Sequence, residues 1–546
     1  MSEAARSPLP QGSHAGSHAG SHAGSHAAAA AVAALERRAA WVAAIIVLVA
    51  AIATMTSDPI GVFNDDGIYL LTAKALAEGQ GYVYPHLPGT PPAIHYPPVW
   101  PMLLAVVWKV APAFPASVGW FKLINPFVIA AAAAVGVRFG QRQFGLPWWV
   151  ALGGVIAAML SVPVLLLTNL LLSEPLFLLL LLPTLRVTER LVREGGVGRA
   201  LAAAALVALL VLVRTLGGVV LIAGVLLLLR ERRWRELLVF AVVTVVLLLP
   251  WQRVVWAASP TFPDELRGSY GPYLEWVIDG YKDGGFAFFR EVLATNVTAT
   301  WAMLGIFVSP LMDGPLRHVS AALATLLFGT GLLALARRHR APVTALAFSG
   351  YLVAVLSWPF WVDRFYWVMW PVVLLVALAG TTTMVQALRA RGRARPAGAR
   401  LAVVTLLAIG HETYNARGLG RGWEGSASRE MTGAGIRLVR QVNDDRSLDG
   451  QLIAAELAPM LALYTGLQVL PVEILTTREH VQDKTQAERV AELERIDRRY
   501  RPSAYLVMQA GPFYSALRAA RLDSARTLVD RSPPGDPVRT LRIQHP

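Results

Sequence analysis

Long apolar segments recur along this chain and constrain its fold more than any other feature. Eleven of them approach the length that a helix needs to cross a lipid bilayer. Hydrophobic residues make up 55% of the sequence and charged residues only 16%, whereas charged residues make up about 25% of a soluble domain. The sequence therefore predicts an α-helical polytopic membrane protein with about 11 transmembrane helices and excludes an ordinary soluble enzyme. The expected spans are residues 39–55, 120–137, 147–162, 164–185, 200–215, 217–229, 236–256, 318–336, 341–358, 365–386 and 400–414.

Basic residues lie in five short clusters between these spans. Lys and Arg total 50 against 36 Asp and Glu, a formal net charge of +14 that in a soluble protein would suggest a nucleic-acid partner. If the chain crosses the membrane at each expected span, all the clusters fall on one side of the membrane, as expected for cytoplasmic loops. We therefore expect no nucleic-acid partner and a multi-pass protein of the cell inner (plasma) membrane with a cytoplasmic N-terminus. Because the number of spans is odd, the C-terminus should be extracytoplasmic. The clusters start at Arg138, Arg186, Arg230, Arg337 and Arg389.

The region before the first span lacks the apolar pattern and predicts a disordered, low-complexity cytoplasmic tail over residues 1–36. Gly-Ser-His-Ala occurs four times in a row from Gly12 to Ala27. A metal-binding arm is one interpretation of the four histidines. Neutral expansion of the repeat is the favoured interpretation, because Gly and Ser before each His argue against a stable helix.

The rest of the chain divides into a membrane domain and a C-terminal domain. Residues 37–415 hold the predicted spans and two long outer loops, 57–119 and 257–317. The apolar part of the second loop, 286–312, is expected to be interfacial or re-entrant. Residues 416–546 lose the apolar runs and predict a small extracytoplasmic α/β domain.

Short apolar runs in this last domain indicate a sheet. Strands are expected at 451–455, 468–472 and 504–508, and a helix at 457–464. A further strand at 539–543 would close the sheet.

An acidic pair, Asp65 and Asp66, follows the first predicted span. Asn64 or Asp65 can cap a helix that runs to about residue 78. One interpretation of the pair is capping with a favourable helix dipole, which would justify one Asp. The other is catalysis, because carboxylates forced together acquire split pKa values, which suits a general base. Lys74, two turns further on, can pair with an acid, extend to lipid phosphates or hold a substrate phosphate.

Further ionisable and aromatic residues lie at the predicted outer ends of spans. His95 and Tyr96 stand in a proline-rich crossing that would present them at the membrane surface. Glu174 lies in an apolar helix, where a carboxylate is costly unless it faces a cavity, a partner or water at the helix end. Arg214 is either a plain loop arginine or, with Arg364, part of a phosphate site, because the arginine fork suits phosphate oxygens.

Taken in order, these motifs resemble the integral membrane glycosyltransferases of the GT-C fold, which use lipid-linked sugars. The bacterial branch with aminoarabinose transferases and protein O-mannosyltransferase-like proteins, glycosyltransferase family 39-like, is similar. The resemblance covers about residues 36–415. The matching motifs are Asp65-Asp66-x-x-Tyr69, Glu78-Gly79-x-Gly81-Tyr82, Tyr96-Pro97-Pro98 leading to Pro101, Leu172-Ser173-Glu174-Pro175-Leu176-Phe177, and Arg364-Phe365-Tyr366 before Pro371.

The resemblance implies sugar transfer from a polyprenyl phosphate donor to a lipid, glycan or protein acceptor on the extracytoplasmic face, among membrane lipids. It implies that Asp65 is the general base that deprotonates the acceptor. The family often has Glu at the second acidic position, where this chain has Asp66, which would orient the base or the acceptor. Contacts to substrate or phosphate are expected from Lys74, His95, Tyr96, Glu174, Arg214, Arg364 and Tyr366.

The metal question is left open, because the resemblance points both ways and no metal-ligand spacing is recognisable. If a divalent cation binds, the acids of the second outer loop, together with Asp65 and Asp66, would be the carboxylates positioned to help. The chain has no cysteine, which excludes disulfides, thiolate metal sites and a cysteine nucleophile. The loop acids are Asp264, Glu265, Asp279, Asp283 and Glu291.

Two other classes of protein compete with this interpretation. A transporter or a flippase for lipid-linked sugars would also have many spans, but it would place acids near the bilayer midplane and show repeated halves. A non-catalytic envelope scaffold would keep its function when Asp65 is replaced by Asn. The sequence has no phosphate loop, dinucleotide motif, zincin motif or serine-hydrolase elbow, so ATP-driven transport and those hydrolytic chemistries have no support.

Overall fold

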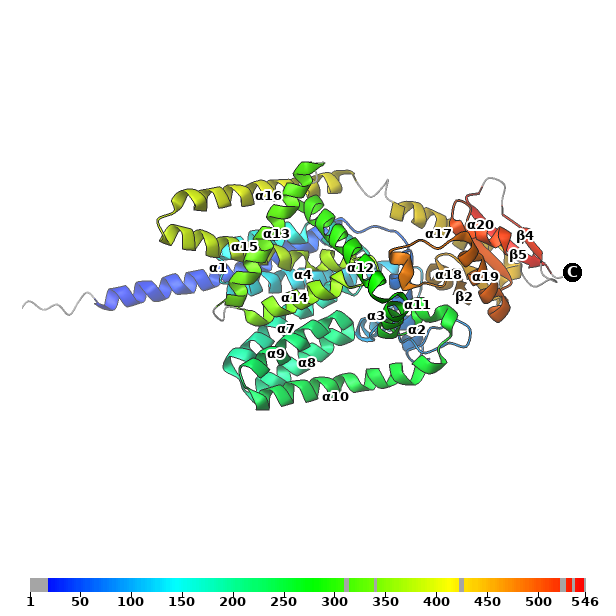
Figure 1. Ribbon diagram of the computed structural model, residues 1–546, viewed down its shortest axis with the longest axis horizontal. Helices are drawn as coiled ribbons and strands as arrows, with labels where there is room; N and C mark the ends of the chain where they lie inside the picture. Colours follow the sequence, from blue (N-terminus) through cyan, green and yellow to red (C-terminus); the bar gives the residue numbers. More distant parts are fainter. Residues whose placement is uncertain are drawn as a thin grey trace, which may run out of the picture.

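Apolar helices form the body of the molecule and run side by side along its long axis, with the C-terminal domain at one end (Figure 1). The computed structural model describes residues 18–308, 314–337, 341–421, 427–520, 527–532 and 536–544. Runs of Leu, Val and Ala form helices here because a helix satisfies its own backbone hydrogen bonds, which lipid cannot do. The first helices are α1 (His18–Ala53), α2 (Asp65–Ala77), α3 (Val99–Val110), α4 (Val118–Phe144), α5 (Trp148–Met159), α6 (Val162–Asn169), α7 (Glu174–Glu194) and α8 (Val197–Val213). The next are α9 (Gly218–Arg230), α10 (Trp234–Ala258), α11 (Asp264–Tyr270), α12 (Tyr273–Val308), α13 (Pro315–Ala336), α14 (Pro342–Leu356), α15 (Asp363–Ala390) and α16 (Ala394–Arg421).

Several of these helices can cross a membrane. Within the described residues, α4, α10, α13 and α15 are long and apolar enough, and the bent pair α5 and α6 makes a fifth candidate. Helices α3, α8, α9 and α14 are apolar but shorter. The helical membrane body is thus confirmed, while the count of eleven spans stays a prediction.

The expected span 164–185 is wrong as a single helix. Helix α6 ends at Asn169, the chain is extended at Leu170, and α7 begins at Glu174. Pro175 explains the break, because proline fits the first turn of a helix but cannot donate the hydrogen bond that a helix interior needs. Helices α5 and α6 are also bent by 60° relative to each other. The break exposes backbone carbonyls at 170–172, two of which accept hydrogen bonds from the Asn125 side chain at 2.6 and 3.3 Å.

The N-terminal tail also differs from the prediction. Disorder was expected through residue 36, but α1 is helical from His18 onward. The alanine-rich stretch that follows the repeats has a high helix propensity and extends the first span backwards. Residues 1–17, with His14, lie outside the described residues.

The apolar part of the second outer loop belongs to α12, which bends at Gly285, where φ is 60°. Its interfacial position stays a prediction, and its last residues, 309–312, lie outside the described part of the chain.

The C-terminal domain is a five-stranded sheet with helices, and its strand order is β2-β1-β3-β5-β4. Strand β1 pairs in parallel with β2 and β3, while β5 pairs antiparallel with β3 and β4. The four expected strands are confirmed; β4 was not predicted, because a four-residue edge strand has little apolar pattern. The elements are α17 (Ala427–Asp444), β1 (Ile453–Ala455), α18 (Ala458–Thr465), β2 (Val469–Pro471), η5 (Thr477–His480), α19 (Gln486–Tyr500), β3 (Ala504–Met508), α20 (Pro512–Ala519), β4 (Thr527–Asp530) and β5 (Val538–Gln544), with short 3-10 turns at Thr215–Gly217, Ser259–Thr261 and Arg446–Leu448.

The two outer loops and the C-terminal domain pack together at one end of the body (Figure 1). The Tyr84 hydroxyl donates to the carbonyl of Tyr270 at 3.0 Å, which joins the two loops. The backbone N–H of Ile60 donates to the Tyr464 hydroxyl at 3.1 Å, which joins the first loop to α18. The segments expected on one side of the membrane therefore form one continuous layer.

Candidate active site

The acidic pair lies at the first turn of α2, but the two carboxylates face different surroundings. The expected side-chain cap is absent, because Asn64 makes no capping hydrogen bond and has φ 57°. Both oxygens of Asp66 instead accept backbone N–H groups, from Gly61 at 3.0 Å and Gly67 at 2.9 Å. Asp66 is only 2% exposed. Its contacts favour a role in holding the turn 61–67, while the expected role of orienting the base or the acceptor stays a prediction.

The pKa of Asp66 is raised to about 6. Burial is the main cause and the charge of Asp65 adds to it, while the N–H of Gly61 acts in the opposite direction. By pKa alone Asp66 would be the better base. Its burial and its two backbone contacts leave it without access to a substrate, so geometry decides against it.

Asp65 is held at the edge of a polar cluster. One oxygen accepts a hydrogen bond from the Tyr96 hydroxyl at 2.7 Å, and the other accepts one from Arg364 at 2.7 Å. Its side chain is 20% exposed. Burial alone would raise the pKa of Asp65, but the Arg364 charge and the Tyr96 hydrogen bond outweigh it and hold the pKa below its usual value. Asp65 is therefore an ionised carboxylate that solvent and a ligand can reach.

Glu174 joins the two arginines of the cluster. Arg364 donates to one of its oxygens at 2.7 and 3.1 Å, and Arg214 lies 2.9 Å from the other. Glu174 is fully buried. The interpretation that it simply reaches water is therefore wrong, and the partner interpretation holds. Arg214 also donates to the Ser173 hydroxyl at 3.1 Å, so both residues at the start of α7 orient it.

Asp65, Glu174, Arg214 and Arg364 thus form a cluster with two charges of each sign, drawn from α2, α7, the end of α8 and α15. The contacts of Arg214 to protein acceptors use one terminal nitrogen, Nη1, among the described residues. Since a guanidinium has five N–H donors, donors of Arg214 remain for a further acceptor. The Arg214 guanidinium also lies 5.7 Å from the centre of the Phe365 ring.

Aromatic side chains form the wall beside Asp65. The His95 Nδ1 donates to the carbonyl of Gly271 at 2.6 Å, and its ring lies 3.7 Å from that of Tyr273. Burial lowers the pKa of His95 to about 4, although the Gly271 contact and Asp65 oppose this, so the ring is neutral. The Tyr96 ring lies between His95 and Tyr69, at 4.6 and 4.7 Å. Tyr273 was not predicted, because an isolated tyrosine in an outer loop carries no motif.

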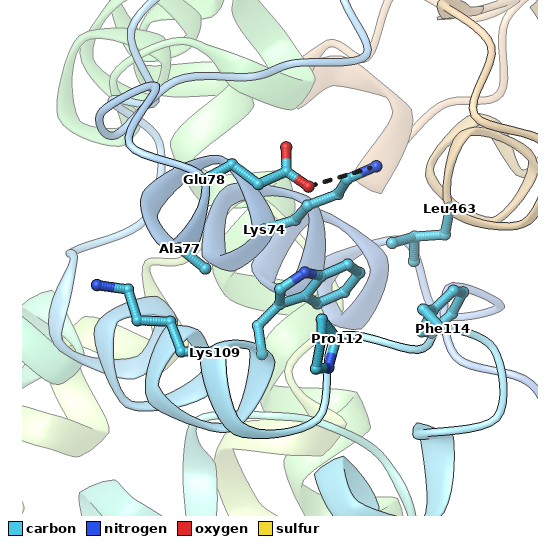
Figure 2. Close-up of a pocket in the computed structure, with 8 residues that line it drawn as sticks. Lys74, Ala77, Glu78, Lys109, Pro112, Phe114 and Leu463 are labelled. Atoms are coloured by element: carbon cyan, nitrogen blue, oxygen red, sulfur yellow. Dashed lines mark ion pairs between the residues drawn. The ribbon is translucent and has the colours of Figure 1, made fainter.

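Two of the expected site residues lie elsewhere. The Lys74 amine pairs with Glu78 at 4.0 Å and lies 5.9 Å from the Trp108 ring centre, in a separate cavity of about 450 Å³ (Figure 2). Helical spacing carries Lys74 away from the face of α2 that holds Asp65. The Tyr366 hydroxyl bonds to Thr300 at 2.6 Å and not to the charged cluster. The structure therefore groups Asp65, Tyr96, Glu174, Arg214 and Arg364 with His95 beside them, and leaves out Lys74 and Tyr366.

No group of three or more His, Asp or Glu side chains among the described residues could hold a metal ion. The carboxylates of the cluster are bridged by arginine, whose positive charge would repel a cation there. The second-loop acids do not join it: Asp264 and Glu275 pair with Arg267, and Glu265 pairs with Arg499. The donor set therefore does not fit a divalent cation, and no chemical step is derived through one.

A polytopic helical body, an outer loop layer with a buried acid and arginine cluster, and an α/β domain packed against that layer define the class of this protein. It is an integral membrane protein with a GT-C-like fold. The oligosaccharyltransferase of Archaeoglobus fulgidus, in its apo form, is similar with a TM-score of 0.50 and 12% identity over 94% of this chain and 74% of that one. At this identity the similarity shows the fold, and it confirms the architecture that the motifs predicted.

Two further solved structures align over most of their length. ArnT from Cupriavidus metallidurans bound to undecaprenyl phosphate gives a TM-score of 0.45 and 16% identity over 92% of this chain and 96% of that one. The same protein in the apo state gives a TM-score of 0.43 and 15% identity, again over 92% of this chain and 96% of that one. No protein-family model and no curated protein sequence matches the chain.

Proposed function

We propose that the protein is a membrane glycosyltransferase. It moves a sugar from a polyprenyl phosphate donor to an acceptor on the extracytoplasmic face, with inversion at the anomeric carbon. The observation that carries the proposal is Asp65, an ionised and partly exposed carboxylate that pairs with Arg364, which Glu174 links to Arg214, in a GT-C-like fold. Activated nucleotide sugars are absent outside the cytoplasm, so a lipid-linked donor fits an outer site.

The reaction is a single displacement. The acceptor hydroxyl gives its proton to Asp65, its oxygen attacks the anomeric carbon, and the bond from that carbon to the phosphate oxygen breaks. Because the pKa of Asp65 is below its usual value, the proton moves only as the new bond makes the hydroxyl acidic. The polyprenyl phosphate leaves with the electron pair of the broken bond.

The arginines act on the departing phosphate. Arg214 has free donors for phosphate oxygens, and Arg364 holds Asp65 in place while it adds positive charge to the site. Glu174 keeps both guanidiniums in one orientation. Tyr96 fixes the rotation of the Asp65 carboxylate through its hydrogen bond.

The reaction class is tested with short-chain polyprenyl phosphate donors that carry a labelled sugar, in membranes with and without the protein. We expect that the labelled sugar becomes covalently attached to an acceptor only in the membranes that contain the protein. Intact donor that crosses proteoliposome membranes without cleavage would instead identify a transporter or flippase. If the protein neither transfers nor transports any donor of the panel, the result would point to a scaffold and contradict the proposal.

A further inference from the structure

A second cavity, of about 710 Å³, lies between α12 and the C-terminal domain. Its volume is in the range of about 300–1,000 Å³ that small-molecule sites occupy. One wall is α12 around its bend at Gly285, and the opposite wall is η5, the loop after it and one face of α19. The α12 wall is formed by residues on both sides of the bend: Gly280, Asp283, Gly284, Ala287, Phe288 and Glu291.

Hydrogen bonds fix the two walls of the cavity relative to each other. On one side of the cavity the Trp276 ring N–H donates to the carbonyl of Leu475 at 3.3 Å. On the other side the His480 ring bonds to the Asn296 side chain at 2.8 Å. The Asn296 amide also donates to the carbonyl of Trp358 at 2.8 Å. The space is therefore bounded by two anchored walls.

The charges around the cavity are mostly negative. Six carboxylates and three basic side chains line it. Lys484 pairs with Glu479 and Glu492 at 2.8 and 2.9 Å, and Arg478 pairs with Glu488 at 2.9 Å. Within the described residues, this leaves Asp283, Glu291, Asp483 and Arg495 without an ion pair.

The unpaired carboxylates favour a ligand that donates hydrogen bonds. Ionised carboxylates accept hydrogen bonds and donate none, so they match the hydroxyl groups of a sugar. They repel a phosphate group, which makes this cavity unsuitable for the donor. Arg495 adds a donor for ring or hydroxyl oxygens.

The cavity and the site lie along the same helix, α12. Tyr273, the first residue of α12, stacks on His95 beside Asp65. Gly280, in the cavity wall, comes seven residues later, which is about 10 Å along a helix. A molecule that occupies the cavity and reacts at Asp65 must therefore extend over at least this distance, which takes several sugar units.

We propose that this cavity binds the acceptor and that the acceptor is a neutral, hydroxyl-rich glycan. The inference rests on the proposed function. The reacting hydroxyl lies at Asp65, and the distal sugars of the same chain lie between α12 and α19. The C-terminal domain thus takes part in selecting the acceptor.

The test uses the full-length protein with two variants. Ala287→Trp fills the cavity, and the double variant Asp283→Asn/Glu291→Gln removes two unpaired charges without changing shape. Matched controls on α12 outside the cavity are Ala294→Trp and Asp279→Asn, both at exposed positions. Transfer of labelled sugar from a short-chain polyprenyl phosphate is measured in envelope membranes that supply the acceptor, and binding of the same donor is measured on purified protein.

Both cavity variants should lose transfer by about tenfold or more, the effect of about 1.4 kcal/mol of lost binding, while donor binding and both controls stay at the wild-type level. Wild-type transfer in both cavity variants would overturn the inference, as would a parallel loss of donor binding. The labelled sugar should be recovered attached to a glycan. Release by alkaline elimination as a single sugar would identify a protein acceptor and also overturn it. Absence of transfer by the wild type would instead refute the proposed function.

Discussion

Asp65 and Asp66 are adjacent in the chain and have opposite environments. Asp65 accepts hydrogen bonds from Arg364 and Tyr96, which keep its carboxylate ionised. Asp66 is buried next to the C-terminal domain and accepts hydrogen bonds from two backbone N–H groups. The difference comes from helix geometry, which turns consecutive side chains by about 100°. The sequence identified the pair, and the family resemblance implied a role for each carboxylate, but the sequence could not predict their hydrogen-bond partners, because several of these come from distant parts of the chain.

Glu174 should be essential to the cluster. We expect Glu174→Gln to lower the free energy of unfolding by about 2–4 kcal/mol, since it leaves two arginines without their buried counter-charge. It should also abolish sugar transfer, because Arg364 loses its orientation. Thermal unfolding in detergent and the transfer assay check both effects.

Glu194→Gln is the matched control. Glu194 forms a surface ion pair with Arg199 at 2.7 Å and is 50% exposed, so its loss should change stability by at most about 0.5 kcal/mol. Equal behaviour of the Glu174 and Glu194 variants would contradict the assigned role of Glu174.

His95 predicts a dependence of stability on pH. Its folded pKa of about 4 is below the ordinary 6.5, so the unfolded chain binds a proton that the folded protein does not. The stability it contributes is present above pH 6.5 and is lost as the pH falls toward 4, by up to about 3 kcal/mol.

The His95→Asn variant keeps a donor for Gly271 and cannot titrate, so its unfolding temperature should fall less than that of the wild type between about pH 7 and pH 5. The unfolding temperature of the control variant His318→Asn, at an exposed position, should fall as much as that of the wild type over the same pH range. If the unfolding temperature of His95→Asn changed with pH as steeply as that of the wild type, this histidine would not be held neutral in the folded protein.

At the scale of elements, α2 is held between α3 and α18. The turn before α2 and the first turn of α2 lie so close to α18 that only glycine fits at two positions: a Cβ on Gly61 would be 2.7 Å from the Met460 backbone, and one on Gly67 would be 2.6 Å from Pro459. The C-terminal domain therefore fixes the position of the helix that carries Asp65.

Gly67→Ala should push α18 away from α2. We expect a loss of stability of about 1–3 kcal/mol, typical of overpacking, together with a large loss of transfer, because Asp65 moves relative to Arg364. Gly119→Ala is the control, since nothing lies within 4 Å of its added carbon. Full activity and stability of Gly67→Ala would mean that the contact between α2 and α18 does not position the site.

Most elements could be predicted from apolar periodicity, and the exceptions have local causes. Pro175 divides one expected span into α6 and α7, and that break creates the start of α7 where Ser173 and Glu174 meet Arg214. The motifs also named most of the cluster. They misplaced Lys74, because sequence spacing alone does not tell which face of α2 meets α15 and which meets α3 and Trp108.

At the scale of the whole molecule, the outer loops and the C-terminal domain share one end of the helical body (Figure 1). The basic clusters and the odd number of expected spans predict that this end lies outside the cell and the N-terminus inside. These are long-range arrangements that charge and hydropathy can predict, whereas the cavity between α12 and α19 depends on packing that no local pattern encodes.

The orientation predicts the behaviour of terminal reporters. Alkaline phosphatase, which is active only outside the cytoplasm, should be active when fused after residue 546 and inactive when fused before residue 1. A fluorescent protein that folds only in the cytoplasm should show the reverse. Activity of one reporter at both ends would mean an even number of spans and would place the site on a different face.

The role of Asp65 as the base is tested by the rate of labelled-sugar transfer by purified Asp65→Asn, with donor binding and thermal unfolding measured on the same preparation. The exposed Asp264→Asn variant, from the second outer loop, is the control. We predict that Asp65→Asn binds donor and stays folded but loses transfer by about 100-fold or more, the range for a lost general base, while the control transfers normally. Transfer at the wild-type rate by Asp65→Asn would contradict the role of Asp65 as the base and leave the acidic pair a purely structural role.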